Sequence, residues 1–214
     1  MKLNDAKRVT GHRSGLGKPS KMPGYSTSLP AKACLVGAKL AKVPGSVCFD
    51  CYAMKGNYAY TNVQEGLQRR LDALNDPQWV EGMTTLVGHY TDPDDPHFRI
   101  HDSGDFQSVE HVLNWAYVAI ALPWVKFWGP SREIAMIKLA MAMFKGEWPS
   151  NLVIRISAPM VGKPLNIAGP TSSVDVDAFN NGDDQCPAPT QGNKCGDCRK
   201  CWDPNVSNVN YHKH

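Results

Sequence analysis

The chain has 214 residues, of which 42% are hydrophobic and 20% charged, and its formal net charge is +3. This composition excludes a disordered, collagen-like or coiled-coil chain, and the length predicts one domain, or two at most. The charge is too small to identify a polyanion as the partner. The longest nearly uninterrupted apolar run, residues 115–125, is too short to cross a bilayer and excludes a membrane protein. No secretory signal is visible after Met1, so we expect a cytoplasmic protein.

Residues 1–24 carry six lysines and arginines against a single acid, Asp5. They predict a basic N-terminal arm that is exposed to solvent and through which nucleic acid could bind. Residues 11–20 approach the pattern of a phosphate-binding loop. However, His12 stands where a glycine is needed, and Pro19 stands where the magnesium-binding Ser or Thr is needed.

The rest of the chain, residues 25–214, is predicted to form a single α/β domain. Strand-like runs occur at residues 25–29, 98–101, 125–128 and 152–157, with a weaker one at 174–176. Apolar residues at helical spacing predict helices near residues 63–74, 76–90, 109–120 and 134–144, the second one capped by Asp76 and Pro77. This alternation predicts a partial (β/α) barrel or a small open, mostly parallel sheet. Residues 162–214 are expected to form an irregular, cysteine-rich tail.

The loops that leave the carboxyl ends of parallel strands share one edge of the sheet, which is where such folds place their sites. In this chain those loops are residues 34–51, 102–105, 129–132 and 158–160. Cysteines, acids and an arginine are concentrated in them. The sequence therefore predicts a functional site at this edge.

Four of the seven cysteines lie late in the chain, at positions 186, 195, 198 and 201, and the first of them precedes a proline. A C-x2-C-x2-C run with a separate Cys-Pro is typical of proteins that bind a 4Fe–4S cluster. Zinc is the alternative, because four thiolates also make a closed zinc site. We favour the cluster, since zinc sites usually present two separated pairs of cysteines.

The other three cysteines, Cys34, Cys48 and Cys51, form an early group. Three thiolates on a cubane leave one iron open, and an open position is typical of a catalytic metal. One alternative is a second structural site with a histidine as the fourth ligand. Another is a single cluster shared by the early and late groups.

Between the two groups, residues 98–106 read FRIHDSGDF. We interpret His101, Asp102, Ser103, Gly104 and Asp105 as lining a small-molecule pocket. The alternative for Asp105 is that it only caps the helix beginning near residue 107, and for that residue alone we favour the cap. A nuclease-like site at His101, Asp102 and Asp105 is a weaker hypothesis.

Two arginines are candidates to bind a carboxylate or phosphate near this edge. They are Arg132, after Gly129-Pro130, and Arg155, within a predicted strand. A structural ion pair with an acid such as Asp102 is an equally good interpretation of each.

Several of these motifs together resemble one known family. They are Ser28-Leu-Pro, Cys34, Cys48-x2-Cys51-Tyr-Ala, Arg99-Ile-His-x-Ser-Gly-Asp-Phe106 and Cys195-Gly-x-Cys-x2-Cys-Trp202. Their combination resembles the gene product 88-like proteins of phages and plasmids, over about residues 20 to 203. The resemblance implies a viral or mobile-element origin, with a location in the host cytoplasm, and carries little mechanism.

A more distant similarity is to radical SAM enzymes, which have a three-cysteine loop after the first strand of a partial barrel. It implies that the early cysteines hold a reactive cluster, that Ser103, Gly104 and Asp105 help to bind S-adenosylmethionine, and that the late cysteines hold an auxiliary cluster. The usual loop is C-x3-C-x2-C, whereas thirteen residues separate Cys34 from Cys48.

Two hypotheses follow for the function. The first is an iron–sulfur protein with one or two 4Fe–4S clusters that does redox or SAM-dependent radical chemistry on a small molecule or nucleotide. The second is a non-catalytic module stapled by clusters or zinc, whose basic arm binds nucleic acid or a host protein.

Overall fold

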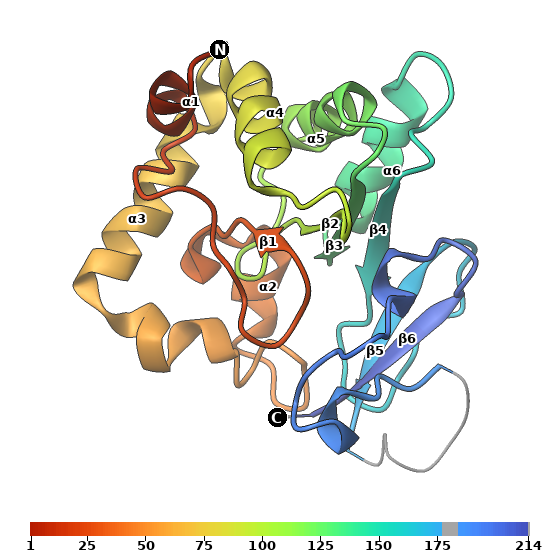
Figure 1. The fold of residues 1–214 in the computed structure, drawn as a ribbon. Coiled ribbons are helices and arrows are strands. Elements are labelled where there is room, and N and C mark those ends of the chain that lie inside the picture. Colours follow the sequence, from red (N-terminus) through yellow and green to blue (C-terminus); the bar gives the residue numbers. More distant parts are fainter. Residues whose placement is uncertain (177–183, 214) are drawn as a thin grey trace.

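A computed structural model describes residues 1–176 and 184–213 of the chain. Its centre is a sheet of six strands, all parallel and in sequence order, which curls into a half-barrel (Figure 1). The strands are β1 (Tyr25–Ser26), β2 (His97–Arg99), β3 (Lys126–Ser131), β4 (Leu152–Ser157), β5 (Thr171–Asp175) and β6 (Asn208–His212). The expected α/β fold with parallel strands and a partial barrel is therefore confirmed.

Helix α1 (Leu3–Val9) precedes the sheet. The helices that connect the first four strands are α2 (Leu35–Leu40), α3 (Thr61–Asp72), α4 (Trp79–Tyr90), α5 (Val109–Ala121) and α6 (Ile134–Met143). Figure 1 shows α1, α4, α5 and α6 in an arc along one side of the molecule. The four predicted helices are α3 to α6. The second begins at Trp79 rather than at Pro77, because Asp76 closes a turn by accepting the Gln78 amide at 2.9 Å.

The two faces of the sheet carry different apolar clusters, because alternate residues of a strand point to opposite faces. Phe98, Phe127 and Ile154 pack against the helices in the main core. Trp128 and Val153 point to the other face and pack against Trp202. The cysteine-rich tail therefore covers the sheet face opposite the helices.

The basic segment at the start of the chain is not a solvated arm. Its helix α1 packs on α4, with Ala6 and Val9 buried. This packing requires glycine at position 82, since a Cβ there would lie 2.6 Å from the Val9 side chain. Beyond α1, the buried His12 bonds through Nε2 to the Thr27 hydroxyl at 2.8 Å, which ties the segment to the end of β1.

The tail is held by a buried arginine. Arg155 in β4 is 0% exposed and donates five hydrogen bonds to main-chain carbonyls. The acceptors are Cys201 (3.0 Å), Thr171 (3.2 Å), Val206 (2.8 Å), Lys200 (2.7 Å) and Asp203 (2.7 Å). Since four of these carbonyls belong to residues 200–206, one guanidinium group fixes the path of the chain from the last cysteines towards β6.

No helix in the described part of the chain is long and apolar enough to span a membrane.

Replacing Arg155 by methionine should lower the free energy of unfolding by about 3 kcal/mol or more, because it leaves several buried carbonyls without donors. Urea denaturation measures this loss. The matched control is Lys126→Met, which removes an exposed cation from the neighbouring strand and should change stability by less than about 0.5 kcal/mol. Equal effects of the two substitutions would contradict the role given to Arg155.

Candidate functional site

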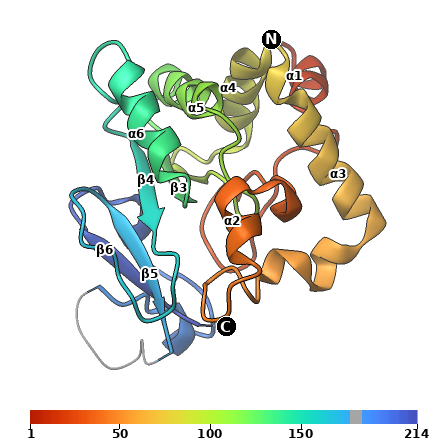
Figure 2. The ribbon, with the colours of Figure 1, turned by 180° about the vertical axis from the view of Figure 1, so that it is seen from behind.

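The early cysteines lie in the loop that leaves the carboxyl end of β1. After Leu29 the chain makes a short 3₁₀ turn, Ala31–Ala33, reaches Cys34 and then enters α2. Figures 1 and 2 both show α2 near the middle of the molecule, between α3 and the strands β3 and β4. The three thiols are thereby placed at the sheet edge that the strand order predicts.

Helix α2 closes the thirteen-residue gap between Cys34 and Cys48. A Cβ built on Gly37 would lie 3.6 Å from both the Cys34 and the Cys48 sulfur, and 3.0 Å from the Cys34 Cβ. Both sulfurs therefore lie close to a position that carries no side chain. Cys51 follows one turn later, with its amide donating to the Cys48 carbonyl at 3.3 Å.

A chain of hydrogen bonds joins this loop to the ends of β2 and β3. Asp105, buried after β2, accepts the Ser131 hydroxyl at 2.6 Å and the Arg132 amide at 2.9 Å. The Ser131 hydroxyl in turn accepts the Glu133 amide, and the Glu133 carboxylate accepts the Val36 amide in α2 at 2.8 Å. The thiol loop is therefore attached to two strand ends through buried carboxylates.

The predicted cap by Asp105 is wrong, because Ser108 caps α5 by accepting the His111 amide at 3.0 Å. Asp105 joins two strands instead. Burial raises its pKa to about 6, although its hydrogen bonds from Arg132, Ser131 and Phe106 act in the opposite direction.

Burial and neighbouring groups disfavour the thiolate form of two early cysteines. Burial, together with Asp105, Cys51, Cys48 and Glu133, raises the pKa of Cys34 to about 12. Burial also raises the pKa of Cys48, while Arg132 opposes that shift. Cys34 and Cys48 therefore favour the neutral thiol over the thiolate.

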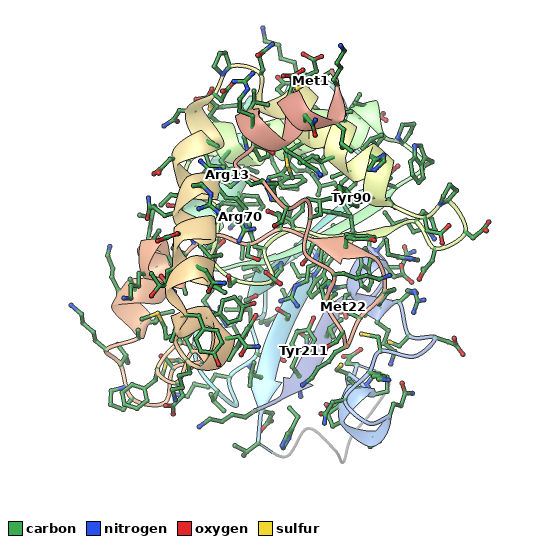
Figure 3. All side chains as sticks on the ribbon, turned by 60° about the vertical axis from the view of Figure 1, so that its left-hand side comes forward. Met1, Arg13, Met22, Arg70, Tyr90 and Tyr211 are labelled. Carbon is green, nitrogen blue, oxygen red and sulfur yellow. The ribbon has the colours of Figure 1, made fainter. Side chains whose placement is uncertain are left out.

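The late cysteines form a second group in the tail. Cys186, Cys195, Cys198 and Cys201 interact electrostatically with one another. Main-chain bonds hold two of them, from the Cys186 amide to Asn210 (2.9 Å) and from the Cys195 amide to Lys21 (2.8 Å). Cys201 lies 3.1 Å from the Tyr211 hydroxyl, and burial raises its pKa to about 12. Figure 3 shows Tyr211 and Met22 close together in this part of the molecule.

Asp102 is surrounded by a polar cluster that the sequence motifs do not predict. The carboxylate accepts the Ser26 hydroxyl at 3.2 Å and interacts electrostatically with Arg70 of α3 and Arg99 of β2. Tyr52, next to Cys51, donates to the Asp102 carbonyl. Arg99 also lies over the Trp128 ring, 4.9 Å from its centre. Of the residues in this cluster that were not predicted, only Arg99 carried a signal in the sequence, because it lies within the motif of residues 98–106.

Three atoms near this edge have unused hydrogen-bonding capacity. Asp102 Oδ1, Arg99 Nε and Arg132 Nε are buried and have no partner among the described residues. Buried polar atoms normally have partners, so an unpartnered set at a sheet edge is the kind that a ligand completes.

Three other residues of the predicted pocket, His101, Ser103 and Gly104, make packing contacts and internal hydrogen bonds. His101 has a φ of 58°, is 2% exposed, and borders a cavity of about 10 Å³ that has room for one water. Ser103 donates to the Leu29 carbonyl at 2.9 Å. Gly104 has a φ of 81°, and a Cβ there would lie 2.6 Å from the Leu29 Cβ. These residues hold the end of β2 against the start of the thiol loop.

Of the predicted site residues, the structure brings Asp105 and Arg132 to the early thiols and leaves Arg155 apart. Arg155 was expected to bind an anion or pair with an acid, but its guanidinium is occupied by main-chain carbonyls. Glu133 was not predicted. Its position directly after Arg132, at a strand end, was the available signal.

Replacing Gly37 by alanine should lower the metal content of the early group, because the added Cβ presses on Cys34 and Cys48. The measurement is the amount of metal bound per chain after anaerobic purification. Gly56→Ala is the control, since a Cβ at Gly56 meets nothing within 4 Å. Gly56 has a positive φ, so the control must first be shown to keep its secondary structure. Unchanged metal content in Gly37→Ala would contradict the assigned geometry.

The buried histidines should make the protein less stable in acid. Burial lowers the pKa of His12 and His111 to about 3, from an ordinary 6.5. The unfolded chain therefore binds protons that the folded chain does not, and the free energy of unfolding falls as pH drops from 6.5 towards 3. His111→Gln keeps a hydrogen-bond acceptor but takes up no proton. Denaturation at pH 7 and pH 5 should show a smaller loss for this variant, and an equal loss would contradict the assignment.

Searches among curated proteins and among solved structures find no match to the chain. A protein-family model described as Gene product 88 matches residues 1–204. Since this match spans nearly all of the sequence, the chain belongs to the gene product 88 family.

Proposed function

We propose that this protein is an iron–sulfur enzyme whose reactive cluster is held by the early cysteines at the carboxyl edge of the half-barrel. The observation that carries the proposal is the placing of Cys34 and Cys48 beside Gly37, with Cys51 close enough to interact with both thiols and with Asp105 and Arg132 nearby. Active sites of parallel α/β folds lie at this edge of the sheet. Three thiols there suit a metal cluster that keeps one coordination position open.

The two cysteine groups would take different roles. The four late thiols are a complete ligand set for a 4Fe–4S cluster, and they lie in a tail that Arg155 fixes to the sheet. The three early thiols leave one iron without a protein ligand. When bound, that cluster supplies one-electron chemistry and an open coordination position, for which we propose S-adenosylmethionine as the cosubstrate.

The protein's own residues would bind and orient the small molecule. Asp102 offers an acceptor, while Arg99 and Arg132 offer donors, at atoms that have no partner among the described residues. Such a mixture suits a ligand with both an amino and a carboxylate or phosphate group. The Tyr52 ring lies between Cys51 and Asp102, so it would cover the early cluster on that side.

The alternative is a zinc-stapled module without catalysis. A zinc ion holds its thiolates at about 2.3 Å and so within about 4 Å of one another. In residues 1–176 and 184–213, no group of three or more His, Cys, Asp or Glu side chains is arranged to hold a metal ion. A cubane spreads its ligands more widely, because each thiolate binds a different iron. The spacing supports the cluster over zinc, because Cys195, Cys198 and Cys201 form a C-x2-C-x2-C triplet rather than two separated pairs.

Metal analysis of the anaerobically purified protein tests the proposal. We expect a brown protein with about eight irons and matching sulfide per chain, two 4Fe–4S clusters in all. The pair Cys48→Ala/Cys51→Ala should retain about four irons and lose binding of S-adenosylmethionine in equilibrium dialysis. The pair Cys195→Ala/Cys198→Ala should also retain about four. Phe49→Ala changes an exposed residue of the same loop and should retain all the iron.

About four irons in the unmodified protein would contradict the two-cluster arrangement, and the same cysteine pairs would show which group holds the single cluster. A colourless protein with stoichiometric zinc would contradict both clusters and the radical chemistry. Full iron without binding of S-adenosylmethionine would retain the clusters and overturn the cosubstrate.

A further inference from the structure

An open cleft of about 700 Å³ lies between the start of the chain and the carboxyl end of α3. Its walls come from α1, the loop after α1 and the carboxyl end of α3, and it is lined by the cations Lys7, Arg8, Arg13 and Arg69. Figure 3 shows Arg13 close to α3. The cleft joins cations that are separated by more than fifty positions in the sequence.

The fold builds this cleft rigidly. The loop after α1 presses against α3, because a Cβ on Gly11 would lie 2.4 Å from the Arg69 carbonyl. The φ of Gly11 is +72°, a conformation that glycine adopts most readily. The buried His12, next in the chain, anchors the loop through its hydrogen bond to the Thr27 hydroxyl. Arg13, which follows directly, is exposed at the rim of the cleft.

The cations of the cleft are mostly unpaired. Within the described part of the chain, Lys7, Arg13 and Arg69 form no ion pair, and Lys7 only approaches the Tyr90 ring, at 6.0 Å. The Nε of Arg69 is buried without a partner among those residues. Arg8 contacts Asp5 at 3.9 Å, at the limit of an ion pair.

Two acids also line the cleft, but both are engaged locally. Asp72 accepts the Gln68 side-chain amide at 2.7 Å, and Asp76 accepts the Gln78 main-chain amide at 2.9 Å. The lining therefore has four cations against two carboxylates. Its unpaired donors suit an anionic ligand.

We propose that this cleft binds the phosphate backbone of a nucleic-acid duplex, without reading its sequence. Arginine and lysine donors suit phosphate oxygens, and such contacts position a protein on nucleic acid without specifying a sequence. None of the described residues that line the cleft is aromatic, so these residues offer no surface on which a flipped or single-stranded base could stack. This makes a duplex backbone a better occupant than a free nucleotide or a single strand.

The proposal does not depend on bound iron. The cleft is formed by α1, α3 and the loop between α1 and β1, none of which contains a cysteine. Iron and sulfide content reports on the clusters alone, whereas duplex binding reports on the cleft alone. Either can fail without the other.

The test is fluorescence anisotropy of a labelled 20-base-pair DNA duplex with the full-length protein, over a series of salt concentrations. If Lys7, Arg13 and Arg69 each neutralise one phosphate, log Kobs should fall with log[salt] with a slope of about −3. Arg13→Gln/Arg69→Gln should weaken binding and bring the slope to about −1. Unlabelled single-stranded DNA and ADP serve as competitors and should displace the duplex poorly.

A control of equal charge separates this cleft from general attraction. Lys138→Gln/Lys145→Gln removes two exposed cations on and after α6 and should leave the slope near that of the unmodified protein. Equal losses in the two double variants would overturn the proposal, because binding would then follow net charge only. Efficient displacement by ADP or by single-stranded DNA would overturn the assignment to a duplex. Circular dichroism of each variant checks that it is folded.

Discussion

The buried carboxylate of Asp105 is the contact on which the geometry of the carboxyl edge depends. It lies after β2 and accepts the Phe106 amide, the Ser131 hydroxyl and the Arg132 amide, so it fixes the end of β3 against the end of β2. The Ser131 hydroxyl also accepts the Glu133 amide, and the Glu133 carboxylate accepts the Val36 amide at the start of α2, so the hydrogen bonds continue into the thiol loop. The early thiols therefore take their positions from hydrogen bonds to strand ends, although they lie in a loop. A site on a loop gains precision when a rigid scaffold holds it in this way.

A similar arrangement holds the late thiols on the opposite face of the sheet. There the guanidinium of Arg155 binds tail carbonyls, and Trp202 packs on Trp128 while its indole nitrogen donates to the Phe98 carbonyl at 3.0 Å. Arg99 lies between the two groups, since it interacts with Tyr52 beside Cys51 and with Tyr211 beside Cys201. The half-buried Arg99 cation thus connects the surroundings of the two sets of thiols.

The elements found from the sequence were those with strong local patterns. The helices α3 to α6 carry apolar residues at helical spacing, and β4 is rich in β-branched apolar residues, so both were predicted with nearly correct bounds. The helices α1 and α2 have only seven and six residues and were missed, because packing on α4 and contacts to Glu133 stabilise them rather than their own periodicity. β6 was missed because its Asn208 and Asn210 pair with Ser173 through side-chain hydrogen bonds instead of apolar contacts.

The sequence by itself determined the parallel α/β class, the two groups of cysteines and the sheet edge at which the early group lies. These follow from periodicity, from spacing and from the rule that parallel strands end at one edge. Only the tertiary structure decided that Asp105 joins two strands, that Arg155 binds the tail, and that the basic segment folds into the wall of a cleft with α3. The physical reason is that a buried charge selects its partners by three-dimensional proximity. Carbonyls from residues 171 to 206 around one guanidinium leave no pattern in the order of residues along the chain.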